Sequence, residues 1–192
     1  IRIELSFIKK IGIEWTKNGI FNRICKIIDQ SLSSSIYASL ANIPTLSDKS
    51  IENICLQLNH LQALIISNCE SLKNPKIIAP NLKGLQLCDC PNLTIPFISC
   101  KNLSKLFFRN TPKLKDETIH HLKDNTPELK FLELFNCSNI QNVQIHLQKL
   151  INLNFNHCEN LKEICIHSME LRKLIITNSH HLQNIQCGLL PN

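Results

Sequence analysis

Two cysteines separated by one aspartate, Cys88-Asp89-Cys90, stand in the segment LKGLQLCDCPNL (82–93). This group could bind a metal, form a redox pair or supply the nucleophile of a Cys-x-Asp ligase. Structural zinc sites commonly take paired cysteines with two to four residues between them, and the chain has no such pair. Ten cysteines in 192 residues are also below the density of small disulfide-stabilised secreted domains. The element that carries the cysteines therefore decides their role.

A second candidate for chemistry is the pair His146 and His167, with Cys165 close by. We expect both histidines at the same outward position of adjacent strands, about 5 Å apart. They could bind a metal ion. The favoured explanation of the pair is instead that the two histidines occupy equivalent positions of an internal repeat. The chain has no glycine-rich phosphate loop, its four glycines are isolated, and no Ser-His-Asp set can be placed. We therefore expect a protein that is not an enzyme and has no cofactor or metal.

An internal repeat explains where the cysteines fall. Six segments fit the pattern L-x-x-L-x-[LIF]-x-[NDH]-[CTS]-x-x-[LI]; they start at Leu61, Leu82, Leu103, Leu129, Leu150 and Leu171. Their starts are 21, 21, 26, 21 and 21 residues apart. A degenerate copy starts at Ser35, 26 residues before the first full segment. The spacings 26, 21 and 21 thus occur twice, which chance does not explain.

Two kinds of element are expected between these segments. The long gaps carry apolar residues at helical spacing after a polar cap, which predicts short helices. These residues are Ile51, Ile54, Cys55 and Leu58, then Ile119 and Leu122. The short gaps alternate apolar and polar residues, which predicts outer strands. Their apolar residues are Val143, Ile145 and Leu147, then Ile164 and Ile166, then Ile185, Cys187 and Leu189.

The repeat resembles the leucine-rich repeat family, specifically the cysteine-containing subtype of F-box-type substrate receptors. The resemblance covers about residues 35–192. It implies an α/β solenoid with a parallel concave sheet and an outer side of mixed short helices and short strands. Because the short gaps carry strands where this subtype has helices, we expect shallower curvature. Residues 1–34 fit less well and are expected to form a degenerate repeat or cap, with a helix over 15–27.

Four cysteines share one repeat position; they are Cys69, Cys90, Cys137 and Cys158. Thr111 and Ser179 fill that position elsewhere, and neither replaces a zinc thiolate well. A small side chain with a weak donor suits a turn that must satisfy a buried backbone carbonyl. We therefore expect these cysteines to be reduced, buried and inert, which indicates a cytoplasmic protein.

Each repeat segment is called a rung here. The position before these cysteines is asparagine or aspartate in every rung except one, where it is His157. Asparagine tolerates turn dihedrals and bonds local backbone, so we expect a polar ladder that caps the strands. Cys88-Asp89-Cys90 is then one rung of the repeat. In bacterial ubiquitin ligases with leucine-rich repeats, the resemblance implies, the Cys-x-Asp nucleophile lies in a separate helical domain instead.

Charge and hydropathy limit the classes of partner. The net charge is +6, but the lysines and arginines are scattered, so we expect no nucleic-acid tail and no polybasic membrane patch. No apolar stretch approaches the ~20 residues of a membrane span. The N-terminal segment does not read as a signal peptide. It also lacks a starting methionine, which suggests a fragment of a longer protein.

The residues between the inward leucines predict a binding surface on the concave face. They include Gln62, Ala63, Ile65, Lys83, Gly84, Gln86, Cys88, Ile151, Asn152, Asn154, Asn156, Arg172, Lys173 and Ile175. The expected partner-binding site is the set Lys105, Phe107, Arg109, Phe131, Glu133 and Phe135. Exposed aromatic rings beside cations are typical of binding hot spots. The alternative is that an adjoining segment or a second copy covers these rings.

These features predict a non-catalytic module that binds a partner protein on its concave face. The resemblance implies substrate selection for ubiquitination, although no F-box is visible. The Ile, Asn and Lys bias suggests an AT-rich genome and fits an effector of an intracellular bacterium, acting in the host cytosol. The alternative is a structural spacer or an oligomerisation segment. Since Asn192 occupies a leucine position, the fragment is expected to self-associate or to be capped by further sequence.

Overall fold

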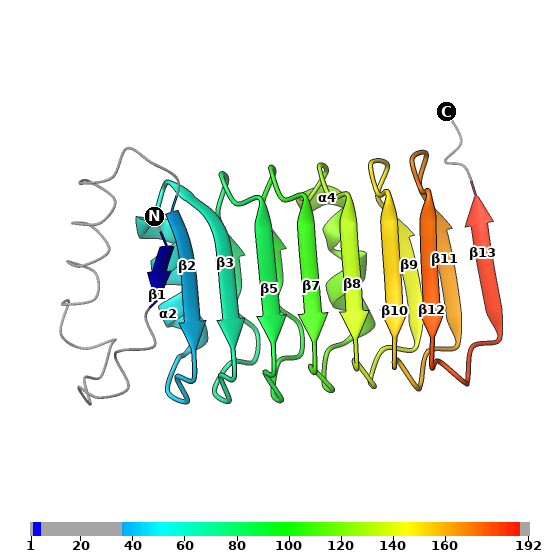
Figure 1. The fold of residues 1–192 in the computed structure, drawn as a ribbon, viewed down its shortest axis with the longest axis horizontal. Coiled ribbons are helices and arrows are strands. Elements are labelled where there is room, and N and C mark those ends of the chain that lie inside the picture. The colour runs from blue at the N-terminus through cyan, green and yellow to red at the C-terminus, as the bar shows by residue number, and fades with distance from the viewer. Residues whose placement is uncertain (1, 5–35, 189–192) are drawn as a thin grey trace.

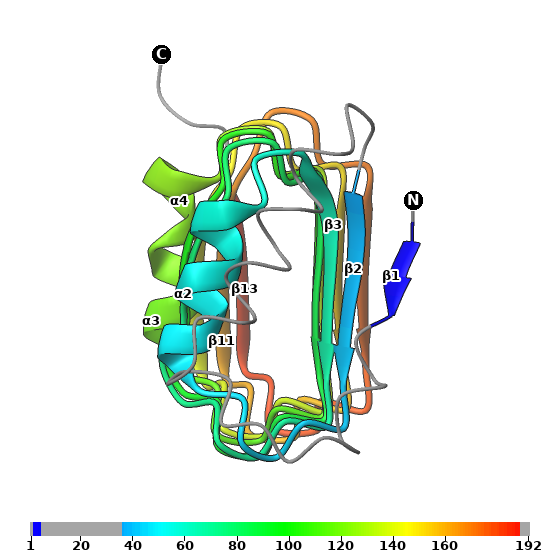
Figure 2. The same ribbon diagram turned by 90° about the vertical axis from the view of Figure 1, so that its left-hand side faces the viewer.

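The computed structural model describes residues 2–4 and 36–188, which form two facing layers (Figure 1, Figure 2). Strands predominate, helices are few, and the paired strands run parallel within each sheet of the described part. This confirms the α/β class expected from the sequence. The predicted helix over 15–27, and the positions of Leu189 and Asn192, lie outside the described residues.

The first layer is a sheet of eight parallel strands, which faces the viewer in Figure 1. In spatial order they are β1 (Arg2–Glu4), β2 (Ile36–Ala41), β3 (Leu61–Ser67), β5 (Gly84–Cys88), β7 (Lys105–Arg109), β8 (Phe131–Phe135), β10 (Asn152–Asn156) and β12 (Lys173–Thr177). From β3 to β12 the strands pair without offset, so that Leu85 lies beside Leu106. Equivalent repeat positions therefore form straight rows across the sheet.

The second layer mixes helices with strands that run opposite to those of the first layer (Figure 1). Its elements are α2 (Asp48–Gln57), β4 (Lys76–Ile78), β6 (Phe97–Ser99), α3 (Asp116–His120), α4 (Leu122–Asn125), β9 (Asn142–His146), β11 (Glu163–His167) and β13 (Asn184–Gly188). The expected helices and outer strands form, although the helix around Ile119 and Leu122 is split in two. The short strands β4 and β6 were not predicted. No helix among the described residues has the length and hydropathy needed to cross a membrane.

The length of a gap decides which element covers the core. A ten-residue helix is about 15 Å long, a distance that a strand covers with about five residues. The 21-residue repeats have room for such a strand, whereas the 26-residue repeats supply the extra residues that α2 needs. Ser47 caps α2, because its Oγ accepts a hydrogen bond from the backbone N–H of Ser50 at 3.2 Å.

Two aspartates fix the helical repeats to the rungs that follow them. The carboxylate of Asp48, at the start of α2, accepts backbone hydrogen bonds from Lys73 and Asn74, both at 3.0 Å. Asp116, at the start of α3, accepts the equivalent pair of bonds from the backbone of the following rung, at 2.9 and 3.0 Å. The twice-occurring spacing in the sequence thus corresponds to the same device used twice.

The core of the described part lies between the layers and consists of rows of aliphatic side chains, together with two phenylalanines and several cysteines. The inward residues of the central strands are buried; they are Leu85, Leu87, Leu106, Phe108, Leu132, Leu134, Leu153 and Phe155. The second layer contributes Ile77, Ile98, Ile119, Val143 and Ile164 to the same core. Buried and partly exposed residues alternate along each of these strands. This alternation confirms the predicted inward leucines.

The predicted polar column is a row of residues with left-handed backbone. Asn42, Asn68, Asp89, Asn110, Asn136, His157 and Asn178 all have φ between 51° and 57°. Asparagine and aspartate enter this region at lower cost than other non-glycine residues. Side chains also bond from rung to rung: Asn110 Nδ2 donates to Asp89 Oδ1 at 2.7 Å, and Asn136 Nδ2 to Asn110 Oδ1 at 3.0 Å. Such a ladder suits the nearly flat sheet in Figure 2.

The thiols of the cysteine column lie within hydrogen-bonding reach of backbone carbonyls, although the carbonyls of Ser67 and Cys88 also accept backbone N–H groups from the neighbouring rungs. Cys90 Sγ lies 3.2 Å from the carbonyl oxygen of Cys88, and Cys69 Sγ lies 3.3 Å from that of Ser67. Cys69, Cys90, Cys137 and Cys158 are buried free thiols. Burial raises the pKa of Cys90 to about 12. The hydrogen bond with Cys158, together with burial, raises that of Cys137 well above its usual range.

Thiol titration of the native chain is therefore expected to reach few of the ten thiols. Cys187 is exposed and should react first, whereas Cys90 and Cys137 should react only on unfolding, because the thiolate is the reactive form. Alkylation followed by mass spectrometry assigns each reaction, and all ten should be modified in denaturant. Cys187→Ser, which removes the thiol that is exposed among the described cysteines, is the control. Rapid alkylation of Cys90 in the folded chain would contradict this expectation.

Candidate binding surface on the open sheet face

The face of the eight-stranded sheet that points away from the second layer is called the open face here. All six residues of the predicted site lie on it, three on β7 and three on β8. They are Lys105, Phe107 and Arg109, then Phe131, Glu133 and Phe135, and all are partly or fully exposed. Their neighbours in sequence on both strands are core residues, so the strand period of two divides them as expected.

The register pairs each of these residues with a different kind of neighbour. Phe107 pairs with Glu133, while Lys105 pairs with Phe131 and Arg109 with Phe135. Each ring therefore has a charged side chain directly beside it on the neighbouring strand. This follows because the strands pair without offset and equivalent positions alternate in character.

Close contacts join the charges to the rings. Arg109 Nη2 lies 2.6 Å from Glu133 Oε1, and the Arg109 guanidinium carbon lies 5.8 Å from the centre of the Phe107 ring. Lys105 Nζ lies 5.6 Å from the centre of the Phe131 ring. Each cation is thus held over an aromatic face, where the attraction is worth about 0.5–1 kcal/mol at exposed sites. This holds the side chains in place before a partner binds.

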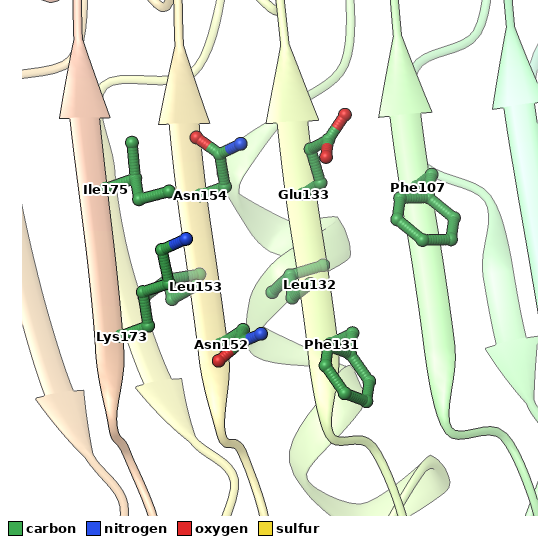
Figure 3. A pocket seen from close by; sticks show the side chains of 9 residues that line it. All are labelled: Phe107, Phe131, Leu132, Glu133, Asn152, Leu153, Asn154, Lys173 and Ile175. Atoms are coloured by element: carbon green, nitrogen blue, oxygen red, sulfur yellow. The ribbon is translucent and has the colours of Figure 1, made fainter.

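A hollow of about 250 Å³ extends from these rings towards β10 and β12 (Figure 3). Its lining includes Phe107, Phe131 and Glu133 from the predicted site. It also includes Asn152, Asn154, Lys173 and Ile175, which were expected on the concave face but were not assigned to the site. The signal that could have included them is the run of alternate asparagines in the segment from 152 to 156.

Two amide oxygens of β10 lack a hydrogen-bond donor in the described part of the chain, and one of them belongs to Asn154, which lines this hollow. Asn154 Oδ1 and Asn156 Oδ1 are buried, and neither accepts a hydrogen bond from the residues that the structure describes. A buried acceptor without a donor costs about 1–3 kcal/mol. A ligand that brings N–H groups to these oxygens would recover that free energy.

Each residue of the Cys88-Asp89-Cys90 group occupies a structural position in the fold. Cys88 is half-buried on the open face, and burial raises its thiol pKa, with the charge of Asp89 adding to the shift. Asp89 accepts a bond in the left-handed column, and Cys90 is buried in the turn. A raised pKa lowers the thiolate fraction and so opposes nucleophilic attack.

The histidine pair lies on the outer sheet formed by β9, β11 and β13. The rings of His146 and His167 stack with centres 4.5 Å apart and planes inclined by 9°, and Cys165 Sγ lies 3.7 Å from His167 Nδ1. Burial lowers the pKa of His146, and the neighbouring charges of His167 and Lys123 add to this effect. Among the described residues no three His, Cys, Asp or Glu side chains are placed to hold a metal ion together.

The open face therefore combines fixed cations, half-buried rings, a hollow and amide oxygens that accept no hydrogen bond from the described residues. These groups can bind apolar, acidic and amide groups together. No protein-family model and no curated protein sequence matches the chain.

Proposed function

We propose that the chain is a leucine-rich-repeat solenoid of the cysteine-containing subtype and that its open face binds a partner protein without catalysis. The observation that carries the proposal is the group of rings and cations around Phe107 and Phe131, next to a hollow on an otherwise regular sheet. Aromatic and arginine side chains at a partly enclosed surface are typical of binding hot spots. The raised pKa of Cys88 also supports a non-catalytic role.

The resemblance to F-box-type substrate receptors extends this proposal to a cellular role. The module would be the substrate-recognition part of a ubiquitin-ligase-type or effector protein in the cytoplasm. Supporting observations are the rows of buried leucines, the alternation of a sheet strand with a second-layer element, and the turn column of asparagines. The free thiols of Cys69, Cys90, Cys137 and Cys158 agree with a reducing compartment.

Truncation of one ring tests the proposal. Phe131→Ala is expected to weaken partner binding about thirtyfold, which corresponds to about 2 kcal/mol, because a packed interface aromatic is removed. The matched control is Phe97→Ala, since Phe97 is 37% exposed and lies on β6 in the second layer. Dissociation constants of both variants, measured by calorimetry against the purified partner, decide the comparison.

The partner for this measurement is identified by photo-crosslinking in the cells that produce the protein. A photoreactive phenylalanine analogue at position 131 reports contacts of the open face, and the same analogue at position 97 reports background. A protein captured only from position 131 is then purified and titrated. Equal affinity of the wild-type and Phe131→Ala chains for every such protein would refute binding through this face.

Assembly of a larger repeat protein is the second candidate, and exposed apolar residues on β12 and β13 favour it. Leu174 and Ile176 on β12 are only partly buried, and Ile185 on β13 is 44% exposed. Both strands also lie at an edge of their sheets in the described part. Unpaired strand edges with apolar side chains favour pairing with another chain.

Self-association of the 192-residue chain is therefore expected at high concentration. Ile185→Lys should shift the chain towards the monomer, because it places a charge in the exposed apolar region. Sedimentation velocity over a concentration series measures the change, with Ile78→Lys as the control, since Ile78 is 41% exposed on β4, far from this edge. A strictly monomeric wild-type chain would contradict this second candidate.

A further inference from the structure

The open face carries a groove whose floor is a single strand. β10 presents three asparagines to this face; they are Asn152, Asn154 and Asn156. Each lies between one β8 residue and one β12 residue: Phe131 and Lys173, Glu133 and Ile175, Phe135 and Thr177. Figure 3 shows the first two of these asparagines between the side chains of β8 and β12. Most of these flanking side chains are longer than asparagine, so the groove runs along β10 and contains the hollow described above.

We propose that this groove binds an extended segment of a partner polypeptide that carries an acidic side chain and, two residues away, an apolar side chain. The inference rests on the function proposed above for the open face and specifies the ligand of that face. The groove has room for one extended chain above β10, because β8 and β12 are two strand spacings apart, about 9.5 Å.

The floor of the groove matches the backbone of such a segment. Asn154 and Asn156 are two residues apart on β10, which corresponds to about 6.6 Å along the strand. In an extended peptide, N–H groups on the same side recur at the same two-residue interval. A segment that runs along β10 can therefore bond to both side-chain amides, once rotation of each amide brings its Oδ1, which accepts no bond from the described residues, to the surface of the groove. A reversed amide would meet the peptide carbonyl groups instead, so the match does not depend on amide orientation.

The β12 wall of the groove determines which side chains of the bound segment fit. When alternate N–H groups point at the floor, side chains i and i+2 point at the same wall. The β12 wall offers Lys173 and, two residues later, Ile175. Lys173 is exposed and forms no ion pair with another described residue, so it suits a carboxylate. Ile175 suits an apolar side chain.

The negative charge on the β8 wall is already neutralised by a neighbouring cation. Glu133 is already paired with Arg109 at 2.6 Å, so it neither repels the acidic segment strongly nor calls for a cation. The Phe131 ring remains beside the hollow and offers an apolar contact. The net charge of +6 also favours the approach of an acidic segment.

Selection of phage-displayed random heptapeptides on the 192-residue chain tests this inference. The expected result is enrichment of peptides in which an Asp or Glu precedes or follows an apolar residue by two positions. Labelled synthetic copies of these peptides should lose at least tenfold in affinity with Lys173→Glu and with Asn154→Leu. Selection on the Lys173→Glu chain should enrich basic residues at the acidic position. Lys76→Glu, which makes the same charge change on exposed β4, should leave the affinity unchanged.

Other outcomes would overturn the inference in distinguishable ways. Peptides that depend on Phe131 but lack an acidic position, or that tolerate Lys173→Glu, would refute the groove ligand and leave partner binding by the open face in place. Failure to enrich any peptide would also refute the groove ligand. The proposed function is then decided separately by the crosslinked partner and the comparison of Phe131→Ala with Phe97→Ala.

Discussion

Replacing Phe108 with alanine is expected to lower the free energy of unfolding by about 3–5 kcal/mol. Phe108 is fully buried on β7, and its removal leaves a cavity that close-packed neighbours do not fill. Phe107 precedes it on the same strand but lies on the open face, half-buried beside Arg109. Phe107→Ala should therefore cost only about 1 kcal/mol, mainly the lost contact with the guanidinium. Urea unfolding of the two variants measures the difference.

The same comparison on the next strand is an independent control. Leu132 is 2% exposed, so Leu132→Ala should cost about 2–5 kcal/mol, whereas Phe131→Ala should change stability little. Stability losses of equal size for Phe107 and Phe108 would show that the outward rings are part of the core. The assignment of the binding surface to this face would then be wrong.

Replacing Asn110 with alanine is expected to lower the free energy of unfolding by about 2–3 kcal/mol. The φ of Asn110 is 51°, and a left-handed backbone costs alanine about 1–2 kcal/mol. The substitution also removes two ladder bonds, one to Asp89 at 2.7 Å and one from Asn136 at 3.0 Å. These bonds are exposed, so each is worth about 0.5 kcal/mol, the lower end of the usual range.

Asn110→Gly separates the two contributions. Glycine adopts positive φ without the steric cost but cannot form the ladder, so this variant should lose about 1 kcal/mol. Chemical unfolding of both variants gives the comparison. An alanine variant as stable as the glycine variant would show that the left-handed backbone contributes nothing to the effect of Asn110.

Most of the fold could be predicted from the sequence because the repeat makes local signals recur. The inward leucines, the helix around Ile51 and Ile54 and the outer strand at Val143 and Ile145 follow from periodicity alone. The left-handed column follows from the recurrence of asparagine at one position. The strands β4 and β6 were missed because each has three residues and one buried side chain, which is too short for an alternating pattern.

The sequence by itself thus determined which residues face the core, which face outwards and where each rung turns, because these depend on period and on backbone preferences. Only the tertiary structure decided how outward side chains combine. Arg109 contacts both Phe107 and Glu133, which joins a charged pair to an aromatic ring. Asn154, between Glu133 and Ile175, becomes the floor of a groove with an unpaired buried oxygen. Such contacts depend on strand register, side-chain length and rotamer, which join residues more than 20 positions apart and leave no local pattern.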